Sequence, residues 1–304
     1  MPIFLRLGAA IGVPGAASGI GRASALRLGQ EGACVVVSDV DEGNGKEVAA
    51  EIEKEGGRAA FIRADVTSEA DQKAMKADAK EGKIVVTYQT FVVRTPKYTI
   101  LVDTCTGEDK GHPAPFDFPG KERWRNELFA LGVSYEQIDY VFCTHLHIDH
   151  TGWNTTLRDG RWVPTFPNAK YIFHKKEYAA WEEEHRKGNN PPGTVFRDNC
   201  LPIVEAGQAL LVDDNYVLDD LISLTPTPGH SPHHCCVNIQ SRGLRCSVVG
   251  DMMHHAIQCR EPDWCPGVDW NPQQAIASRR SFLSSVADTP TLILPIHFPN
   301  PTVG

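Results

Sequence analysis

The pattern of apolar and polar positions changes near residue 82. Before it, residues 34–39 and 59–64 form apolar runs that predict buried strands. Residues 22–30 and 44–55 carry apolar side chains at helical spacing. A weaker, glycine-interrupted run at residues 7–13 precedes them as a first strand. The resulting β-α-β-α-β order is typical of half of a doubly wound parallel sheet.

A different arrangement is predicted for the rest of the chain. Residues 84–93 predict a strand, and residues 98–104 predict its antiparallel partner after a turn at 95–97. We therefore expect two domains, one at residues 1–82 and an α/β domain at residues 83–304. Further strands are predicted at residues 140–143, 171–173, 222–226, 246–250 and 291–297, and helices at residues 175–186 and 273–287.

Composition narrows the class of protein. The chain has 304 residues, enough for one large or two ordinary domains. Hydrophobic residues make up 41% and charged residues 22%, as in soluble globular proteins. A formal net charge of −8 argues against a nucleic-acid partner, since phosphate binding requires a basic surface. No apolar run approaches transmembrane length, so no membrane span is expected.

The cysteines and the N-terminus bear on the compartment. Nine cysteines without a CxxC pair indicate free thiols in a reducing environment. Residues 1–17 are apolar with one arginine, Arg6, and we interpret them as a first strand and its glycine turn rather than a signal peptide. The expected location is therefore the cytoplasm. The sequence does not indicate an oligomeric state.

Four metal-capable side chains lie close together in residues 144–152, Thr-His-Leu-His-Ile-Asp-His-Thr-Gly, which directly follow an apolar run. His145 and His147 are two residues apart, which places both imidazoles on one side of a strand or tight loop. Asp149 and His150 lie past the turn and can face a second point. Imidazole nitrogen and carboxylate oxygen are ligands that zinc accepts. One stretch could therefore serve two neighbouring metal ions.

Three more strand ends carry a metal-capable side chain. His230 follows a Thr-Pro-Gly turn, Asp251 ends a buried strand after a glycine, and His297 ends the last strand. We expect His233 and His234 to have supporting roles, and either His254 or His255 is a further candidate for the pocket wall.

This order of motifs, THxHxDHxG, TPGH, GD and a final histidine, resembles the metallo-β-lactamase superfamily, which consists mostly of zinc-dependent hydrolases. The resemblance implies an αββα sandwich over residues 83–304. It also implies that Asp251 bridges two zinc ions, and that Asp103, at the end of an LVDT strand, helps to fix a ligand histidine. By resemblance, His145, His147 and His230 hold one ion, and Asp149, His150 and His297 hold the other.

The histidine set is closer to the lactonase and glyoxalase II branches than to the true β-lactamases, whose second site usually contains a cysteine. It looks most like the branch that opens N-acyl homoserine lactones. Two adjacent cations lower the pKa of a shared water to about 7, so that hydroxide can attack a carbonyl carbon. Asp149 and Asp251 are the candidate catalytic residues, and Asp149 could orient the nucleophile or pass its proton to the leaving group.

The expected function is therefore zinc-dependent hydrolysis of a small-molecule ester or lactone. An iron-dependent oxidoreductase on the same fold is an alternative from another class. A nucleotide-sensing protein without turnover is a third, and an NAD-dependent dehydrogenase remnant is a fourth. Metal analysis and NAD affinity distinguish these possibilities.

The N-terminal segment resembles the cofactor-binding half of the short-chain dehydrogenases, whose turn is GxxxGxG. The resemblance covers about residues 9–81 and makes NAD a second candidate cofactor. It implies Gly15, Gly19 and Gly21 at the pyrophosphate, Asp39 at the adenosine ribose and Asp65 near the adenine.

The rest of the dehydrogenase pattern is missing after residue 81. Tyr171 and Lys175 match the spacing of that family's catalytic pair, but they belong to the second domain, and we interpret the match as coincidence. Superfamily hydrolases usually begin with more strand before the first hairpin. Supplying strands to the hydrolase is therefore the alternative role for the N-terminal segment.

Overall fold

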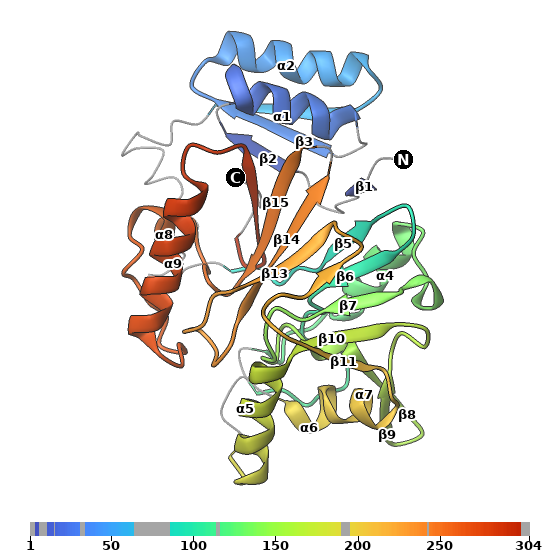
Figure 1. The fold of residues 1–304 in the computed structure, drawn as a ribbon. Coiled ribbons are helices and arrows are strands. Elements are labelled where there is room, and N and C mark those ends of the chain that lie inside the picture. Colours follow the sequence, from blue (N-terminus) through green and yellow to red (C-terminus); the bar gives the residue numbers. More distant parts are fainter. Residues whose placement is uncertain are drawn as a thin grey trace.

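The core of the protein is a sandwich of two β-sheets with helices on its outer faces (Figure 1). This αββα arrangement confirms the predicted fold class. In the described part of the chain, no helix combines the length and the apolar character needed to cross a bilayer. The computed structural model describes residues 4–5, 11–14, 16–30, 34–63, 86–113, 116–189, 195–241 and 243–298.

The first sheet has six strands in the order β1-β5-β6-β7-β10-β11. β5 and β6 form the predicted antiparallel hairpin, and β6, β7, β10 and β11 run parallel to one another. Side chains alternate between the two faces, so that Ile100 and Val102 pack into the layer between the sheets while Leu101 packs under the outer helices. The strands are β1 Phe4–Leu5, β5 Phe91–Arg94, β6 Thr99–Val102, β7 Tyr140–Phe142, β10 Lys170–His174 and β11 Ala209–Val212.

The second sheet has five strands in the order β12-β13-β14-β15-β16. Its pairs are antiparallel except the last, β15 and β16, which helix α9 connects in a parallel crossover. Val237, Ile239 and Val248 point into the same central core as Ile100 and Val102. The strands are β12 Val217–Leu218, β13 Ile222–Pro226, β14 Cys235–Ser241, β15 Leu244–Gly250 and β16 Thr291–Pro295.

Two of the outer helices, α5 (Lys175–Arg186) and α9 (Pro272–Val286), begin at side chains that satisfy a free backbone N–H group. His174 caps α5 by accepting a hydrogen bond from the backbone N–H of Lys176, and Asn271 caps α9 through the N–H of Gln274. The remaining elements are α4 Glu122–Ala130, α5 Lys175–Arg186, α6 Phe196–Asn199, α7 Leu201–Glu205, α8 Ile257–Arg260, α9 Pro272–Val286, the hairpin β8 Thr155–Arg158 and β9 Arg161–Pro164, and the 3₁₀ turns η2 Tyr135–Gln137 and η3 Gly152–Asn154.

The N-terminal segment forms the predicted partial Rossmann unit, with helices packed on a small parallel sheet (Figure 1). Val35 and Val37 on β3 are buried, as is Ile52 on α2. Strand β1 of the same N-terminal segment is not part of this small sheet. It pairs antiparallel with β5, so the segment supplies a strand to the sandwich. Its elements are β2 Ile11–Pro14, α1 Gly19–Gln30, β3 Cys34–Asp39, α2 Glu42–Lys54 and β4 Arg58–Arg63.

The predicted strand at residues 84–93 is wrong over residues 86–90, and residues 84–85 lie outside the described residues. Residues 86–90 are not a strand, and β5 begins only at Phe91. This stretch instead bonds to the chain after β16: Thr87 N–H donates to the His297 carbonyl at 3.0 Å, and Gln89 Nε2 donates to the Ile296 carbonyl at 3.1 Å. Its alternating apolar pattern therefore reflects contact with a loop rather than with a strand.

A close backbone approach joins the first sheet to the loop after β7. The Gly152 N–H donates to the Cys105 carbonyl at 2.7 Å. A Cβ atom at Gly152 would lie 1.9 Å from the carbonyl carbon of Thr106. Since two backbones cannot share that space, only glycine allows the two loops to meet there.

We expect Gly152→Ala to lower the free energy of unfolding by about 1–3 kcal/mol, the usual cost of inserting atoms into a packed site. The measurement is urea unfolding of the metal-free protein. Gly267→Ala is the matched control, because a Cβ atom there meets nothing within 4 Å. Equal stability of the two variants would contradict the close approach.

Candidate metal centre

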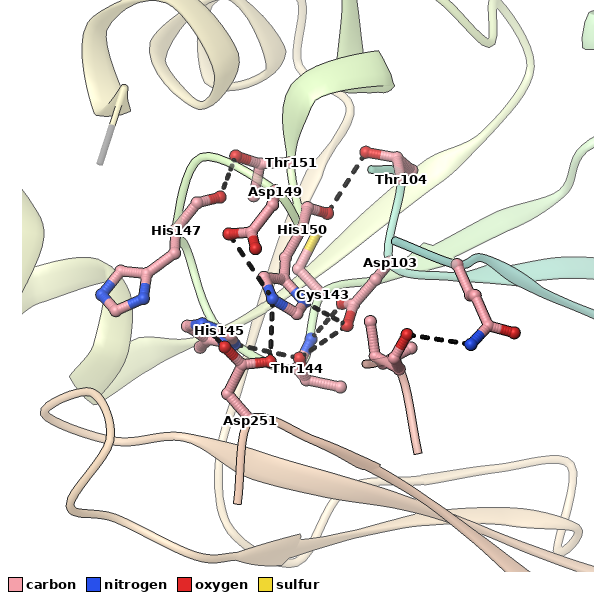
Figure 2. Close-up of polar contacts among 12 residues, drawn as sticks. Asp103, Thr104, Cys143, Thr144, His145, His147, Asp149, His150, Thr151 and Asp251 are labelled. Atoms are coloured by element: carbon pink, nitrogen blue, oxygen red, sulfur yellow. Dashed lines mark hydrogen bonds and ion pairs between the residues drawn. The ribbon is translucent and has the colours of Figure 1, made fainter. Parts of the chain in front are cut away.

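The seven predicted ligands converge at one edge of the sandwich, where strands of both sheets end. His145, His147, Asp149 and His150 come from the loop after β7 (Figure 2). Asp251 approaches from the second sheet, directly after β15. The other two ligands, His230 and His297, follow β13 and β16.

The ligand atoms form two adjacent groups. His145, His147 and His230 can each offer one atom within 4.8 Å of the other two. Asp149, His150, Asp251 and His297 meet the same limit among themselves. His147 is half-buried and the other six residues are buried. The first group contains the three ligands that the resemblance assigns to one ion. The second group contains the three ligands assigned to the other ion together with Asp251.

The Asp251 carboxylate lies between the two groups. Its Oδ1 is 2.9 Å from Nε2 of His150 and 2.9 Å from Nε2 of His297. Its Oδ2 is 3.2 Å from Nε2 of His230 and 3.9 Å from Nε2 of His145. One side chain therefore faces both groups, which is the position that a bridging ligand requires.

Four of the histidines use Nδ1 in a hydrogen bond that points away from the centre. His150 donates to Asp103 at 2.7 Å, His230 to Asp269 at 2.8 Å and His297 to the Thr87 carbonyl at 2.7 Å. His145 Nδ1 lies 3.1 Å from the hydroxyl of Thr144. A neutral ring that carries its proton on Nδ1 has its lone pair on Nε2. The four Nε2 lone pairs therefore face the space around Asp251.

Several of these inward atoms make no directed hydrogen bond, in spite of the short distances between them. They are Nε2 of His145, Nε2 of His150 and Oδ1 of Asp251, all buried. A buried polar atom without a partner is unfavourable by about 1–3 kcal/mol, so three in one cluster require an explanation. Nitrogen and oxygen donors that converge in this way fit a pair of zinc-type cations.

Burial and the neighbouring charges shift the pKa values of the ligand histidines in opposite directions. Burial and the neighbouring imidazoles hold the pKa values of His145 and His147 well below the ordinary range, so both rings stay neutral. Burial also opposes charge on His150, but Asp251, Asp149 and Asp103 outweigh it and hold its pKa well above the ordinary value.

Asp103 orients ligand residues of the centre through hydrogen bonds, as the resemblance of the LVDT strand implies. Besides His150, its carboxylate accepts the N–H and the hydroxyl of Thr144, both at 2.7 Å (Figure 2). Asp103 is fully buried. It therefore orients His150 directly and His145 through Thr144, a role that such partners commonly have around metal ligands.

Two acidic residues that hold the ligand loops, Asp269 and Glu177, were not predicted from the sequence. Asp269 lies in the chain between α8 and α9, 39 residues from the histidine it orients, and no motif marks it. Glu177 lies on a helix whose sequence is highly charged, yet its carboxylate is buried. It accepts from the N–H of Leu146 at 3.2 Å and of His233 at 2.6 Å, and so ties two ligand loops together.

Two further histidines have distinct places. His234 Nε2 accepts a hydrogen bond from the Asp251 N–H at 3.0 Å, which confirms the expected supporting role. His254 Nε2 lies 3.1 Å from Asp251 Oδ2, and its ring stacks on His297 with centroids 5.3 Å apart. Of the two candidates for the pocket wall, His254 is therefore the one in contact with the ligand set.

Aromatic side chains border the group that contains His297. The Tyr88 ring lies edge-on to His297 at 5.7 Å and stacks on Phe118 at 5.5 Å, and Phe116 is 6.1 Å away. All three aromatics are half-buried. Burial raises the pKa of Tyr88 to about 12, with the Asp149 and Asp251 charges adding to the effect. We call these three residues the aromatic wall.

The predicted nucleotide residues are partly described. Gly19, at φ +53°, and Gly21 lie in the first turn of α1, and Asp39 ends β3. The Asp39 carboxylate accepts the N–H groups of Ala17 at 2.8 Å and Asp41 at 3.0 Å, so it lies against the glycine turn. Gly15 and Asp65 lie outside the described residues. Nucleotide binding at this turn stays a prediction.

Comparison with known proteins gives the family. Residues 85–295 match the metallo-beta-lactamase superfamily, and the chain belongs to that superfamily. Residues 9–86 match the short chain dehydrogenases.

Among curated relatives, the chain is 45% identical to a 3-hydroxyacyl-CoA dehydrogenase type-2 of Drosophila melanogaster over 69 residues, 23% of this chain and 26% of that protein. It is 36% identical to a 7alpha-hydroxysteroid dehydrogenase of Escherichia coli over 109 residues, 35% of this chain and 36% of that protein. The chain thus spans about a quarter to a third of these relatives.

Similar solved structures are hydrolases of the superfamily fold. AidC, a dizinc quorum-quenching lactonase in complex with a product, is 25% identical with a TM-score of 0.60, over 76% of this chain and 81% of that one. The hydrolase AbOPH is 21% identical with a TM-score of 0.63, over 78% of this chain and 83% of that one. The likeness to AbOPH concerns the fold alone.

We expect Asp103→Asn to weaken zinc binding about 10- to 100-fold, because an amide has one acceptor oxygen in place of two and cannot accept all three hydrogen bonds from His150 and Thr144. Competition with a chromophoric chelator measures the affinity. Asp288→Asn is the control, since Asp288 is exposed and shares the positive φ of Asp103, 58° against 57°. Wild-type affinity in Asp103→Asn would exclude an orienting role for this carboxylate.

Proposed function

We propose that this protein is a metal-dependent hydrolase that uses two zinc ions to open a lactone or cleave an ester. The observation that carries the proposal is the pair of ligand groups on either side of Asp251. His145, His147 and His230 would hold one ion. Asp149, His150 and His297 would hold the other, and Asp251 would bridge both.

When bound, the metal pair would supply an acidified water and polarise the substrate carbonyl. The protein's own contribution is to position Asp149 as an acceptor for the proton of the attacking water. The two Asp149 oxygens lie 3.7 Å from His150 Nε2 and 3.6 Å from His297 Nε2, and Asp149 is 8% exposed. A carboxylate at this point can take the proton of the attacking water and return it to the leaving alkoxide. No serine or cysteine nucleophile is required.

The surroundings of the centre support a neutral substrate with an apolar part. The aromatic wall borders His297, on the side of the group that contains Asp149. The net charge of −8 disfavours polyanionic substrates. The product in the AidC structure, N-hexanoyl-L-homoserine, combines a small polar head with an acyl chain. An N-acyl homoserine lactone is therefore the substrate class we propose to test first, with simple esters second.

The metal itself separates this proposal from its main rival. An iron-dependent oxidoreductase on the same fold would hold iron in the same ligand groups, so elemental analysis distinguishes the two. Dehydrogenase activity is not proposed, because the matched segment covers only 26% of such an enzyme.

We expect His147→Ala and Asp251→Ala to lower kcat/KM for lactone and ester hydrolysis more than about 100-fold, beyond the effect of changing a residue that only orients a ligand. The assay is a panel of acyl homoserine lactones of increasing chain length together with aryl esters. His185→Ala is the control, since this half-buried histidine lies outside both ligand groups. Retained activity in the first two variants, with the fold verified by circular dichroism, would refute the proposal.

A further inference from the structure

A second cluster of metal-capable side chains lies outside the centre described above. His174 stands between β10 and α5, and Asp214 follows β11 in the first sheet. His233 and Cys235 lie at the start of β14 in the second sheet. His174, His233 and Cys235 each offer one ligand atom within 4.8 Å of the other two. The cluster therefore spans both sheets of the sandwich.

The two histidines share one carboxylate oxygen. Nε2 of His174 lies 2.9 Å from Asp214 Oδ1, and Nε2 of His233 lies 2.8 Å from the same atom. The rings stack with centroids 4.0 Å apart. Lys176 Nζ neutralises the other oxygen, Oδ2, at 2.9 Å. Two imidazole nitrogens thus converge on one point, with a carboxylate oxygen beside them.

The Nε2 atom of His174 is buried and lies beside the Asp214 carboxylate without a directed hydrogen bond. His174 is 3% exposed, and its Nε2 makes no directed hydrogen bond in spite of its closeness to Asp214. A metal ion at this point would give Nε2 of His174 a directed partner.

We propose that His174, His233 and Cys235, with Asp214 as the fourth ligand, form a structural site for a zinc-type ion that ties the two sheets together. Two imidazoles, a thiolate and a carboxylate are a donor set that zinc accepts, and four protein ligands close the coordination sphere. The site shares no ligand with the catalytic centre and does not rest on the function proposed for it.

Binding requires two proton adjustments. The Cys235 thiol releases its proton to solvent as the metal–sulfur bond forms, because thiolate is the ligand. His174 must carry its proton on Nδ1, which gives up the 3.2 Å contact with the N–H of Lys176. Lys176 is exposed, and water can take over that N–H group.

Cobalt titration of the full-length, metal-stripped protein tests the site. The ligands of the catalytic centre are nitrogen and oxygen only, so a thiolate-to-cobalt charge-transfer band reports a cysteine ligand at another site, and its loss in Cys235→Ser would assign it to Cys235. We expect this band in the wild type with about three cobalt ions per chain, two for the centre and one for this site. In Cys235→Ser we expect the band to be lost and the stoichiometry to fall by one. Cys246→Ser, a thiol on the neighbouring strand β15, should leave both unchanged.

Either absence of the band in the wild type or its persistence in Cys235→Ser would overturn the proposal. His233→Ala serves as a second variant if Cys235→Ser does not fold. It should also lose the charge-transfer band and bind one cobalt ion fewer per chain. The cobalt d–d spectrum of the nitrogen–oxygen centre reports separately on the catalytic ions, so failure of one site is distinguishable from failure of the other.

Discussion

The arrangement of this protein depends on one buried carboxylate, Asp251, that faces imidazole nitrogens of both ligand groups. Nitrogens of His150, His230 and His297 lie within 3.2 Å of it. Each of these rings is fixed from behind by a hydrogen bond on Nδ1, so none can turn its lone pair away. Several buried polar atoms of this cluster make no directed hydrogen bond, and cations in the space between them would supply the missing partners. Metal binding and the stability of this edge of the sandwich are therefore coupled.

The scaffold meets this constraint by ending strands of both sheets at one edge. The first sheet contributes the loop after β7, and the second contributes His230, Asp251 and His297. Buried acids connect the loops: Asp103 holds the first loop, and Glu177 joins it to the loop that carries His230. The N-terminal unit adds strand β1 to the edge of the first sheet beside β5. It is thus part of the sandwich as well as a dehydrogenase-like segment.

Much of this was predictable from local patterns. The ligands stand in short motifs at strand ends, and the order of those motifs resembles the metallo-β-lactamase superfamily, so their grouping was predicted from that resemblance. Asp103 could be predicted because it ends an apolar strand in a recognisable motif. Asp269 and Glu177 could not, since long-range packing alone brings them to the ligands, and the charged sequence of α5 favoured an exposed Glu177. The strand predicted at residues 84–93 failed for a related reason: its alternation matched a loop contact, and strand pairing depends on partners that the local sequence does not specify.

The most direct test of the metal centre is a crystal structure with anomalous diffraction data collected on either side of the zinc absorption edge. The account predicts two anomalous peaks at this edge of the sandwich, one among His145, His147 and His230 and one among Asp149, His150 and His297, with Asp251 between them. Peaks at these positions that appear only across the iron edge would assign the centre to oxidoreductase chemistry. A well-ordered site without either peak, in protein supplied with zinc, would contradict the account.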